Sequence, residues 1–297
     1  MDVTADLISV RFLGPLSVCV NGRDVTPTAA KQRRILALLV LNAGRLVTTQ
    51  TLAEELWGDD PPATSAATLQ TYVLQLRKRL RAAASARCDA SRLISTHHGG
   101  YLLQAAGCQT DITDFDRFAR PGRAAAKSGD YRTAADLLSS ALGIWRGPAF
   151  ADVPPGRVLE IEAVSLEEKR LSILERRIEA DLALSRHADL LGELRLLASK
   201  YPMSENLARY LMIALYRSGH AARALEEFHS LRATLHTGLG IEPSPHIQQL
   251  QQAILTRDPA LETAVNVCLP GIAPELTLAP GSARCRSLST RNNRRKR

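Results

Sequence analysis

The sequence predicts a mainly α-helical protein with a small β component, and three observations support this fold class. Short β-rich segments, three helical segments and a hairpin pattern follow one another in the first 105 residues. Helical periodicity dominates from about Asp111, with related segments 34 residues apart. That periodicity fades after residue 258. We therefore expect three regions: a winged helix-turn-helix domain in residues 1–107, an all-α domain of TPR-like helical repeats in 111–258, and a basic, disordered tail in 259–297.

The N-terminal region begins with short strands and continues with helices. Residues 8–25 are rich in β-branched side chains, and Asn21-Gly22 is a strong hairpin-turn signal. The segment TAAKQRRILALLVLNAG then changes to helical spacing, with Thr28 as the expected N-cap and Gly44 just past the end. The segment VTTQTLAEELWG predicts a second helix that begins at a threonine cap and stops at Gly58.

A third helix, expected at about residues 66–83, has two different faces. Its leucines and valine form a core stripe about 60° wide when successive residues are placed 100° apart. No acid occurs from 61 to 88, although exposed helices usually mix acids with bases. Thr and Gln can reach base edges in the DNA major groove, while Arg and Lys neutralise phosphates. The candidate DNA-binding residues of this helix are Thr68, Thr71, Gln75 and Lys78, flanked by Tyr72, Arg77 and Arg79. The alternative is a solvated helix that is merely basic.

The segment RLISTHHGGYLLQ predicts a β-hairpin, or wing, with Gly99-Gly100 near its tip. His97 and His98 at this tip are candidates for contact with phosphate or the minor groove. The alternative is two exposed polar side chains; a metal site is less supported because no further ligand lies nearby in the sequence. Trp57 closes the second helix. A packing role is the commoner one for such a residue, although its indole N–H could reach a phosphate.

The second region consists of helices separated by short breaks. The segment SRHADLLGELRLLASKYP begins at Ser185, and the related segment GHAARALEEFHSLRATL begins at Gly219. A third related segment begins at Gly129. We expect further breaks at WRGPAFADVPPG, at Tyr201-Pro202 and at GLGIEPSP.

Charge and composition favour an anionic partner. The formal net charge is +8: residues 1–110 have 12 basic and 8 acidic side chains, 111–260 have 19 and 20, and 261–297 have 7 and 2. The tail would either add non-specific attraction to phosphates or serve only as a solubilising end. None of the five cysteines forms a C-x-x-C pair, so we expect free thiols in the cytoplasm. No run of 18 apolar residues occurs. We expect that the protein neither associates with a membrane nor binds a metal or a cofactor.

Specific segments resemble a known family. ELWGDDPPATSAATLQTYVLQLRKRL, followed by STHHGGYLL, resembles the OmpR-type DNA-binding domain of the SARP family, the antibiotic regulatory proteins of actinomycetes. ALGIWRGPAFADV and LHTGLGIEPSPHIQQLQQAIL are similar to that family's bacterial transcriptional activation domain. The resemblance covers about residues 8–258 in consistent order. It implies an activator that binds short direct repeats in double-stranded DNA upstream of biosynthetic operons and recruits RNA polymerase.

The resemblance also implies site residues and mode of binding. Thr68, Thr71, Gln75 and Lys78 would read bases, and the flanking residues would face the DNA backbone. Tyr101 matches a backbone-contacting position, whereas His97 stands where OmpR-type wings often have Arg. Neither a receiver domain nor a P-loop is expected, so neither aspartyl phosphorylation nor ATPase control is implied. Direct repeats require two head-to-tail copies, so we expect self-association on DNA as a dimer.

Three other functions remain as alternatives. The G-x-x-x-x-G-K-[ST], H-E-x-x-H and G-x-S-x-G motifs of enzymes are missing, and we expect no enzyme. A helical-repeat scaffold for protein interactions would account for residues 111–258 but not for the basic N-terminal region. A DNA-binding repressor of the same architecture would differ from an activator only in how it affects polymerase.

Overall fold

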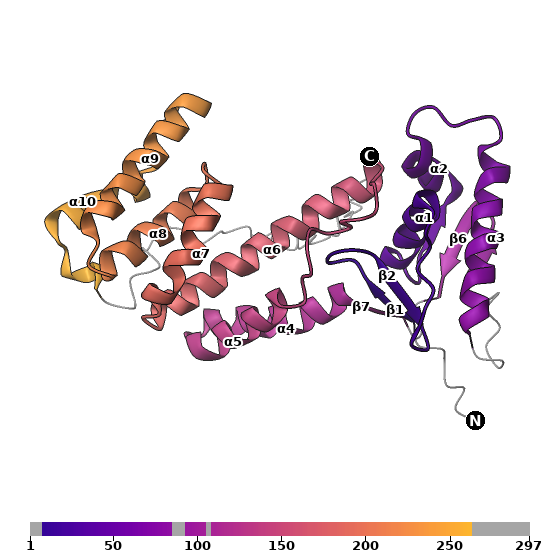
Figure 1. Ribbon diagram of the computed structural model, residues 1–297, viewed down its shortest axis with the longest axis horizontal. Coiled ribbons are helices and arrows are strands. Elements are labelled where there is room, and N and C mark those ends of the chain that lie inside the picture. The colour runs from indigo at the N-terminus through magenta and orange to yellow at the C-terminus, as the bar shows by residue number, and fades with distance from the viewer. Residues whose placement is uncertain (1–7, 85–92, 105–107, 263–297) are drawn as a thin grey trace, which may run out of the picture. The chain divides into compact units, whose positions relative to one another are not determined.

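The computed structural model describes residues 8–84, 93–104 and 108–262, and it begins with a small sheet (Figure 1). Strands β1 (Ile8–Arg11), β2 (Ser17–Val20) and β3 (Arg23–Asp24) form the predicted antiparallel arrangement. The sequence did not predict β7 (Cys108–Thr110), which pairs in parallel with β1 and gives the order β3-β2-β1-β7. The polypeptide that leaves the wing therefore returns to the N-terminal sheet before the helical region begins.

The predicted winged helix-turn-helix is confirmed. Helices α1 (Ala30–Leu41), α2 (Thr49–Trp57) and α3 (Ser65–Ala83) pack against one another. A second sheet has the order β4-β6-β5, from β4 (Leu46–Thr48), β5 (Ile94–His97) and β6 (Gly100–Leu103). Thr48 is the N-cap of α2, with its hydroxyl accepting from the Thr51 N–H (3.0 Å), and Gly58 is the C-cap.

Two expectations for this region were wrong in detail. Thr28 does not cap α1, because the helix begins later, with Ala29 at its N-cap and no side-chain bond there. Strand β4 was not predicted; its three residues pair with the distant strand β6. That pairing requires glycine at Gly100, where an added Cβ would lie 2.3 Å from the Val47 carbonyl oxygen.

The C-terminal region is helical, with breaks at the predicted places. The helices are α4 (Asp111–Lys127), α5 (Tyr131–Leu142), α6 (Arg157–Ala183), α7 (His187–Lys200), α8 (Glu205–Arg217), α9 (Ala221–Leu239) and α10 (Pro245–Thr256). Helices α7, α8 and α9 pack consecutively, and α7 and α9 begin 34 residues apart, as the repeat predicted. The predicted tail begins too early, because η1 (Pro259–Leu261) buries Leu261 in the second core. The remainder of that tail lies outside the described residues.

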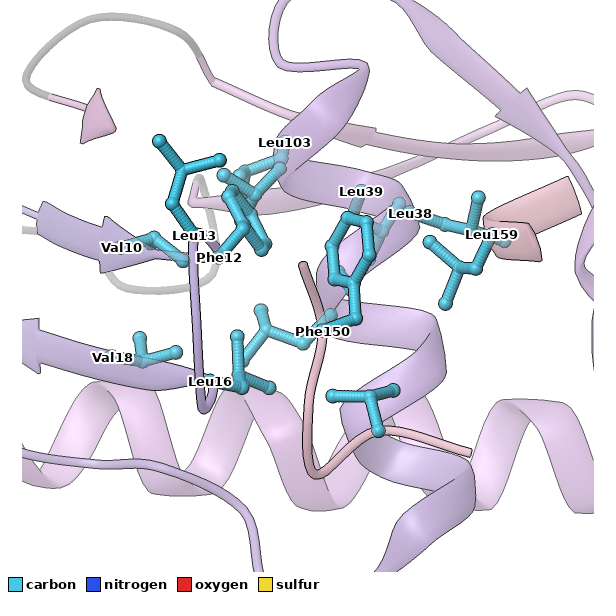
Figure 2. Packing of buried hydrophobic residues seen from close by; sticks show 14 of the residues in the cluster. Val10, Phe12, Leu13, Leu16, Val18, Leu38, Leu39, Leu103, Phe150 and Leu159 are labelled. Atoms are coloured by element: carbon cyan, nitrogen blue, oxygen red, sulfur yellow. The ribbon is translucent and has the colours of Figure 1, made fainter. Parts of the chain in front are cut away.

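The hydrophobic core does not divide where the sequence pattern changes. One cluster joins residues of the N-terminal sheet and α1 to residues of the helical region. In Figure 2, Phe150 and Leu159 lie beside Leu38 and Leu39 of α1. Phe12 and Phe150 bring their ring centroids within 5.4 Å. A second cluster is built from the C-terminal part of α6 through η1.

Two buried acids reinforce the junction between the winged domain and the helices. The Asp111 carboxylate accepts the backbone N–H groups of Phe12 and Leu13 at 2.8–2.9 Å. Burial raises the pKa of this carboxyl, against the opposing effect of these bonds. The Glu55 carboxylate, on α2, accepts the N–H groups of Gly156 (2.6 Å), Val158 (2.9 Å) and Leu159 (3.1 Å) at the start of α6. Glu55 thus satisfies helix N–H groups that would otherwise lack partners.

Candidate nucleic-acid interface

Helix α3 presents an exposed face that has no acidic residue. Leu69, Val73, Leu76 and Leu80 are buried, as the periodicity predicted, and Ala83 is buried with them. On the opposite side Thr71, Gln75 and Lys78 are exposed, whereas Thr68 is half-buried. Most of the candidate base-reading side chains therefore share one accessible face of the helix that the winged fold leaves uncovered.

Two of these side chains already have partners within the protein. The Thr71 hydroxyl donates to the Ala67 carbonyl oxygen (3.0 Å), so its hydrogen is used within the helix. The Gln75 carbonyl oxygen accepts a close hydrogen bond from Nε2 of Gln32, a buried residue of α1. This bond orients the Gln75 amide and leaves its NH₂ group as the donor for a base. Bidentate recognition of adenine uses both the oxygen and the NH₂ group of the amide, so Gln75 would have to give up its hydrogen bond with Gln32.

The flanking residues have different roles in the structure. Arg77 donates from Nε to the Ile94 carbonyl oxygen (2.8 Å) and from Nη2 to the Thr96 hydroxyl (2.7 Å), so it ties α3 to the wing. This geometry favours positioning of the wing over phosphate contact. Tyr72 is half-buried against the core. Arg79 is exposed and donates to the Thr26 carbonyl oxygen (3.2 Å).

An acid lies beside this edge of the domain. The Thr26 hydroxyl donates to Asp24 (2.6 Å), and this hydrogen bond lowers the pKa of the Asp24 carboxyl. The carboxyl therefore stays ionised near Arg79, which reduces the positive potential at this edge. The centre of the exposed face of α3, around Lys78, is the more favourable place for a phosphate-rich ligand.

The wing places its two histidines at the surface. His97 ends β5 and lies 2.9 Å from the Ser95 hydroxyl, and His98 occupies the exposed turn with Gly99. Tyr101 is different: it is 5% exposed, and the Arg77 guanidinium lies 5.9 Å from its ring centroid. Its burial favours a packing role over the backbone contact that the resemblance implied.

Trp57 lies at the end of α2, half-buried against the core. Lys31 Nζ is 5.2 Å from its ring centroid, close enough for a cation–π contact. The packing interpretation is therefore supported for the ring. Contact of any of the predicted residues with DNA stays a prediction.

Sequence reasoning missed one exposed residue on this helix. Leu74 is 65% exposed and lies between Thr71 and Lys78 on the outward side of α3. Its helical angle could have identified it, because it falls well away from the core stripe. The Gln32–Gln75 pair had no such signal, since its members are 43 residues apart.

The chain is similar to bacterial transcription regulators. Residues 23–103 match the model "Transcriptional regulatory protein, C terminal", and residues 110–255 match "Bacterial transcriptional activator domain". Regulatory protein DnrI of Streptomyces peucetius is 45% identical over 257 residues, covering 86% of this chain and 94% of DnrI. Transcriptional regulator RedD of Streptomyces coelicolor is 33% identical, covering 86% of this chain and 72% of RedD.

A solved structure supports the fold. Mycobacterium tuberculosis EmbR, in complex with a low affinity phosphopeptide, aligns with a TM-score of 0.78 at 32% identity. The alignment covers 86% of this chain and 66% of that chain. Within residues 8–84, 93–104 and 108–262, no helix has the length and apolar character needed to cross a membrane.

Proposed function

Because this chain belongs to the SARP family of transcription regulators, we propose that it is a sequence-specific DNA-binding activator of a secondary-metabolite, antibiotic-type gene cluster. It binds direct repeats near promoters and recruits RNA polymerase. In this proposal α3 enters the major groove, the wing lies along the neighbouring backbone, and the helical region organises the complex.

The observation that carries the proposal is the acid-free exposed face of α3. Thr71, Gln75 and Lys78 are exposed together, and the buried side of the same helix fixes their orientation. Phosphates repel carboxylates, so a helix that enters the groove benefits from having none. Arg77 supports the same geometry by holding the wing against α3. A helix adapted only to solvent would gain from acid–base pairs along its length.

The arrangement of the bound copies follows from the size of one winged domain. A single domain reads only a few base pairs, too few to select one site in a genome. Direct repeats spaced by about one helical turn, roughly 10–10.5 bp, would place two copies on the same side of the DNA. A rigid two-fold dimer cannot match repeats that have the same direction. We therefore propose side-by-side association on DNA through the helical region, whose outer face meets polymerase.

DNA footprinting tests the proposal. The probes are duplex fragments from immediately upstream of the genes adjacent to that of the protein. The full chain should protect two repeats on one side of the duplex. Inserting five base pairs between the repeats should abolish binding, and inserting ten should partly restore it. Affinity that ignores the half-turn insertion would refute side-by-side binding.

Transcription in vitro separates activation from repression. Purified RNA polymerase and a template that contains the protected repeats should yield more transcript when the full chain is added. Less transcript at concentrations that fill the repeats would show repression and would overturn the activator proposal.

A further inference from the structure

Leu74 is a large apolar side chain in the middle of the proposed DNA-binding face. It is 65% exposed. Single exposed leucines are ordinary on protein surfaces, and Leu196 of α7 is 75% exposed. The neighbours of Leu74 set it apart, because they come from a helix with no acidic residue and are themselves exposed.

Leu74 belongs to a short apolar strip that runs along the outward side of α3. Ala67, Thr71 and Leu74 are all exposed, and their spacing of four and then three residues places them on one face. The Thr71 hydroxyl donates to the Ala67 carbonyl oxygen (3.0 Å), so its hydrogen is not available to a base, and the side chain can contribute its methyl group as apolar surface. Lys78 continues the same line at its C-terminal end.

The chemistry of the strip identifies its partner. Of the groups on the major-groove edges of bases, the thymine C5-methyl is the one that is apolar. A leucine placed against the polar edge of another base would remove water from that edge without replacing its hydrogen bonds. Lys78 beside the strip complements the phosphates, which favours DNA over an apolar protein surface.

We propose that Leu74 and the Thr71 methyl group contact thymine methyl groups, so that the recognised DNA has thymine at the positions facing this strip. This inference rests on the proposed function, since it requires α3 to lie in the major groove. Leu74 is then a specificity-determining residue that selects by apolar contact, beside the hydrogen bonds supplied by Gln75.

Replacement of single thymines by deoxyuridine tests the inference, because it removes the methyl group and leaves base pairing intact. The preferred duplex is first selected from a random pool with the full chain. Each thymine in that duplex is then replaced in turn. Removing a contacted methyl should weaken binding about three- to fivefold, as expected for one buried carbon. Replacement at other thymines should change binding by less than about 1.5-fold.

Variants assign the effect to the side chain. Leu74→Ala should bind the thymine duplex more weakly and should lose most of the discrimination between thymine and deoxyuridine at one or two positions. Leu74→Met, which stays apolar, should retain discrimination. Leu196→Ala is the matched control, an exposed leucine outside the winged domain, and should behave like the unaltered chain.

The outcomes separate the inference from the function on which it rests. Selective binding in which Leu74→Ala keeps full discrimination would overturn the thymine contact and leave the proposed function standing. A Leu74→Ala variant that binds DNA normally but activates transcription poorly would assign the residue to polymerase and would also overturn the contact. A pool that yields no preferred sequence would overturn both proposals.

Discussion

Replacing Glu55 with alanine should destabilise the junction between the winged domain and α6 much more than replacing its neighbour Glu54. Glu55 is only 1% exposed, and its carboxylate accepts hydrogen bonds from three backbone N–H groups at the start of α6. Alanine would leave those donors without their partner. Glu54 differs in being partly exposed, with its carboxylate 3.7 Å from Arg157.

The expected magnitude follows from the number of bonds and their burial. A hydrogen bond to a charged group contributes about 1.5–3 kcal/mol. The bond to Leu159 is buried, whereas those to Gly156 and Val158 are partly buried, so water can recover part of the loss at two of the donors. We expect Glu55→Ala to lower the free energy of unfolding by about 3–5 kcal/mol, because it leaves up to three backbone donors unpaired at about 1–3 kcal/mol each, less what water recovers. Glu54→Ala should cost less than about 1 kcal/mol.

Equilibrium unfolding in urea measures this difference on the full chain. Trp57 and Trp145 both belong to or pack against the first core, so their fluorescence reports the unit that contains the junction. Far-UV circular dichroism followed in the same samples shows whether the second core unfolds with it. Glu55→Gln, which keeps one acceptor oxygen, should fall between the two alanine variants. A Glu55→Ala loss within about 1 kcal/mol of the Glu54→Ala loss would refute the role given to this carboxylate.

Three further predictions concern the junction, a half-buried acid and the proposed DNA-binding face. Gly156→Ala would place Cβ 2.1 Å from the Glu55 carbonyl oxygen and should lower the unfolding free energy by about 2–4 kcal/mol. Gly192→Ala, which has open space around it, should instead raise the unfolding free energy by up to about 1 kcal/mol. Equal urea midpoints for the two variants would contradict this prediction. Burial raises the pKa of Glu175 above its ordinary 4.5, so the ionised carboxylate opposes folding at pH values above 4.5. Glu175→Gln should therefore raise the melting temperature at pH 7.5, and the gain should shrink as the pH falls toward 4.5. Glu162→Gln, at an exposed position of the same helix, is the matched control, and a Glu175→Gln gain that is independent of pH would disprove the assignment. Gln75→Ala should weaken binding to the selected duplex by about 1–3 kcal/mol and to random duplex much less, as measured by fluorescence anisotropy; equal losses would show that Gln75 does not read bases.

The order of elements could be predicted because each has a local signal. Short sequence windows show the end of α2 at Gly58 and the two faces of α3. The 34-residue spacing between α7 and α9 is visible because the two segments resemble each other. Strands β4 and β7 have only three residues each, too few to show alternation, and they exist because they pair with strands far away in the sequence. Local periodicity carries no information about such pairing.

Helical geometry predicted which side chains of the candidate site are exposed, but it did not predict the hydrogen bonds that they make within the protein. The exposed positions of Thr71, Gln75 and Lys78 follow from helical geometry alone. The bonds that tie Gln75 to α1 and Arg77 to the wing depend on how the helices and sheet pack together. Tyr101 is buried because β6 is the central strand of its sheet, a topology that the hairpin pattern did not reveal.

The most direct test of the central claim, that the exposed face of α3 lies against DNA, is a comparison of two charge reversals. Lys78→Glu and Lys169→Glu both change the net charge by the same amount, and both residues are exposed, one on α3 and the other on α6. Any difference in affinity for the selected duplex therefore reports position rather than total charge. We predict that Lys78→Glu reduces affinity by at least about 100-fold, while Lys169→Glu changes it by less than about threefold. Equal losses for the two folded variants would contradict the account.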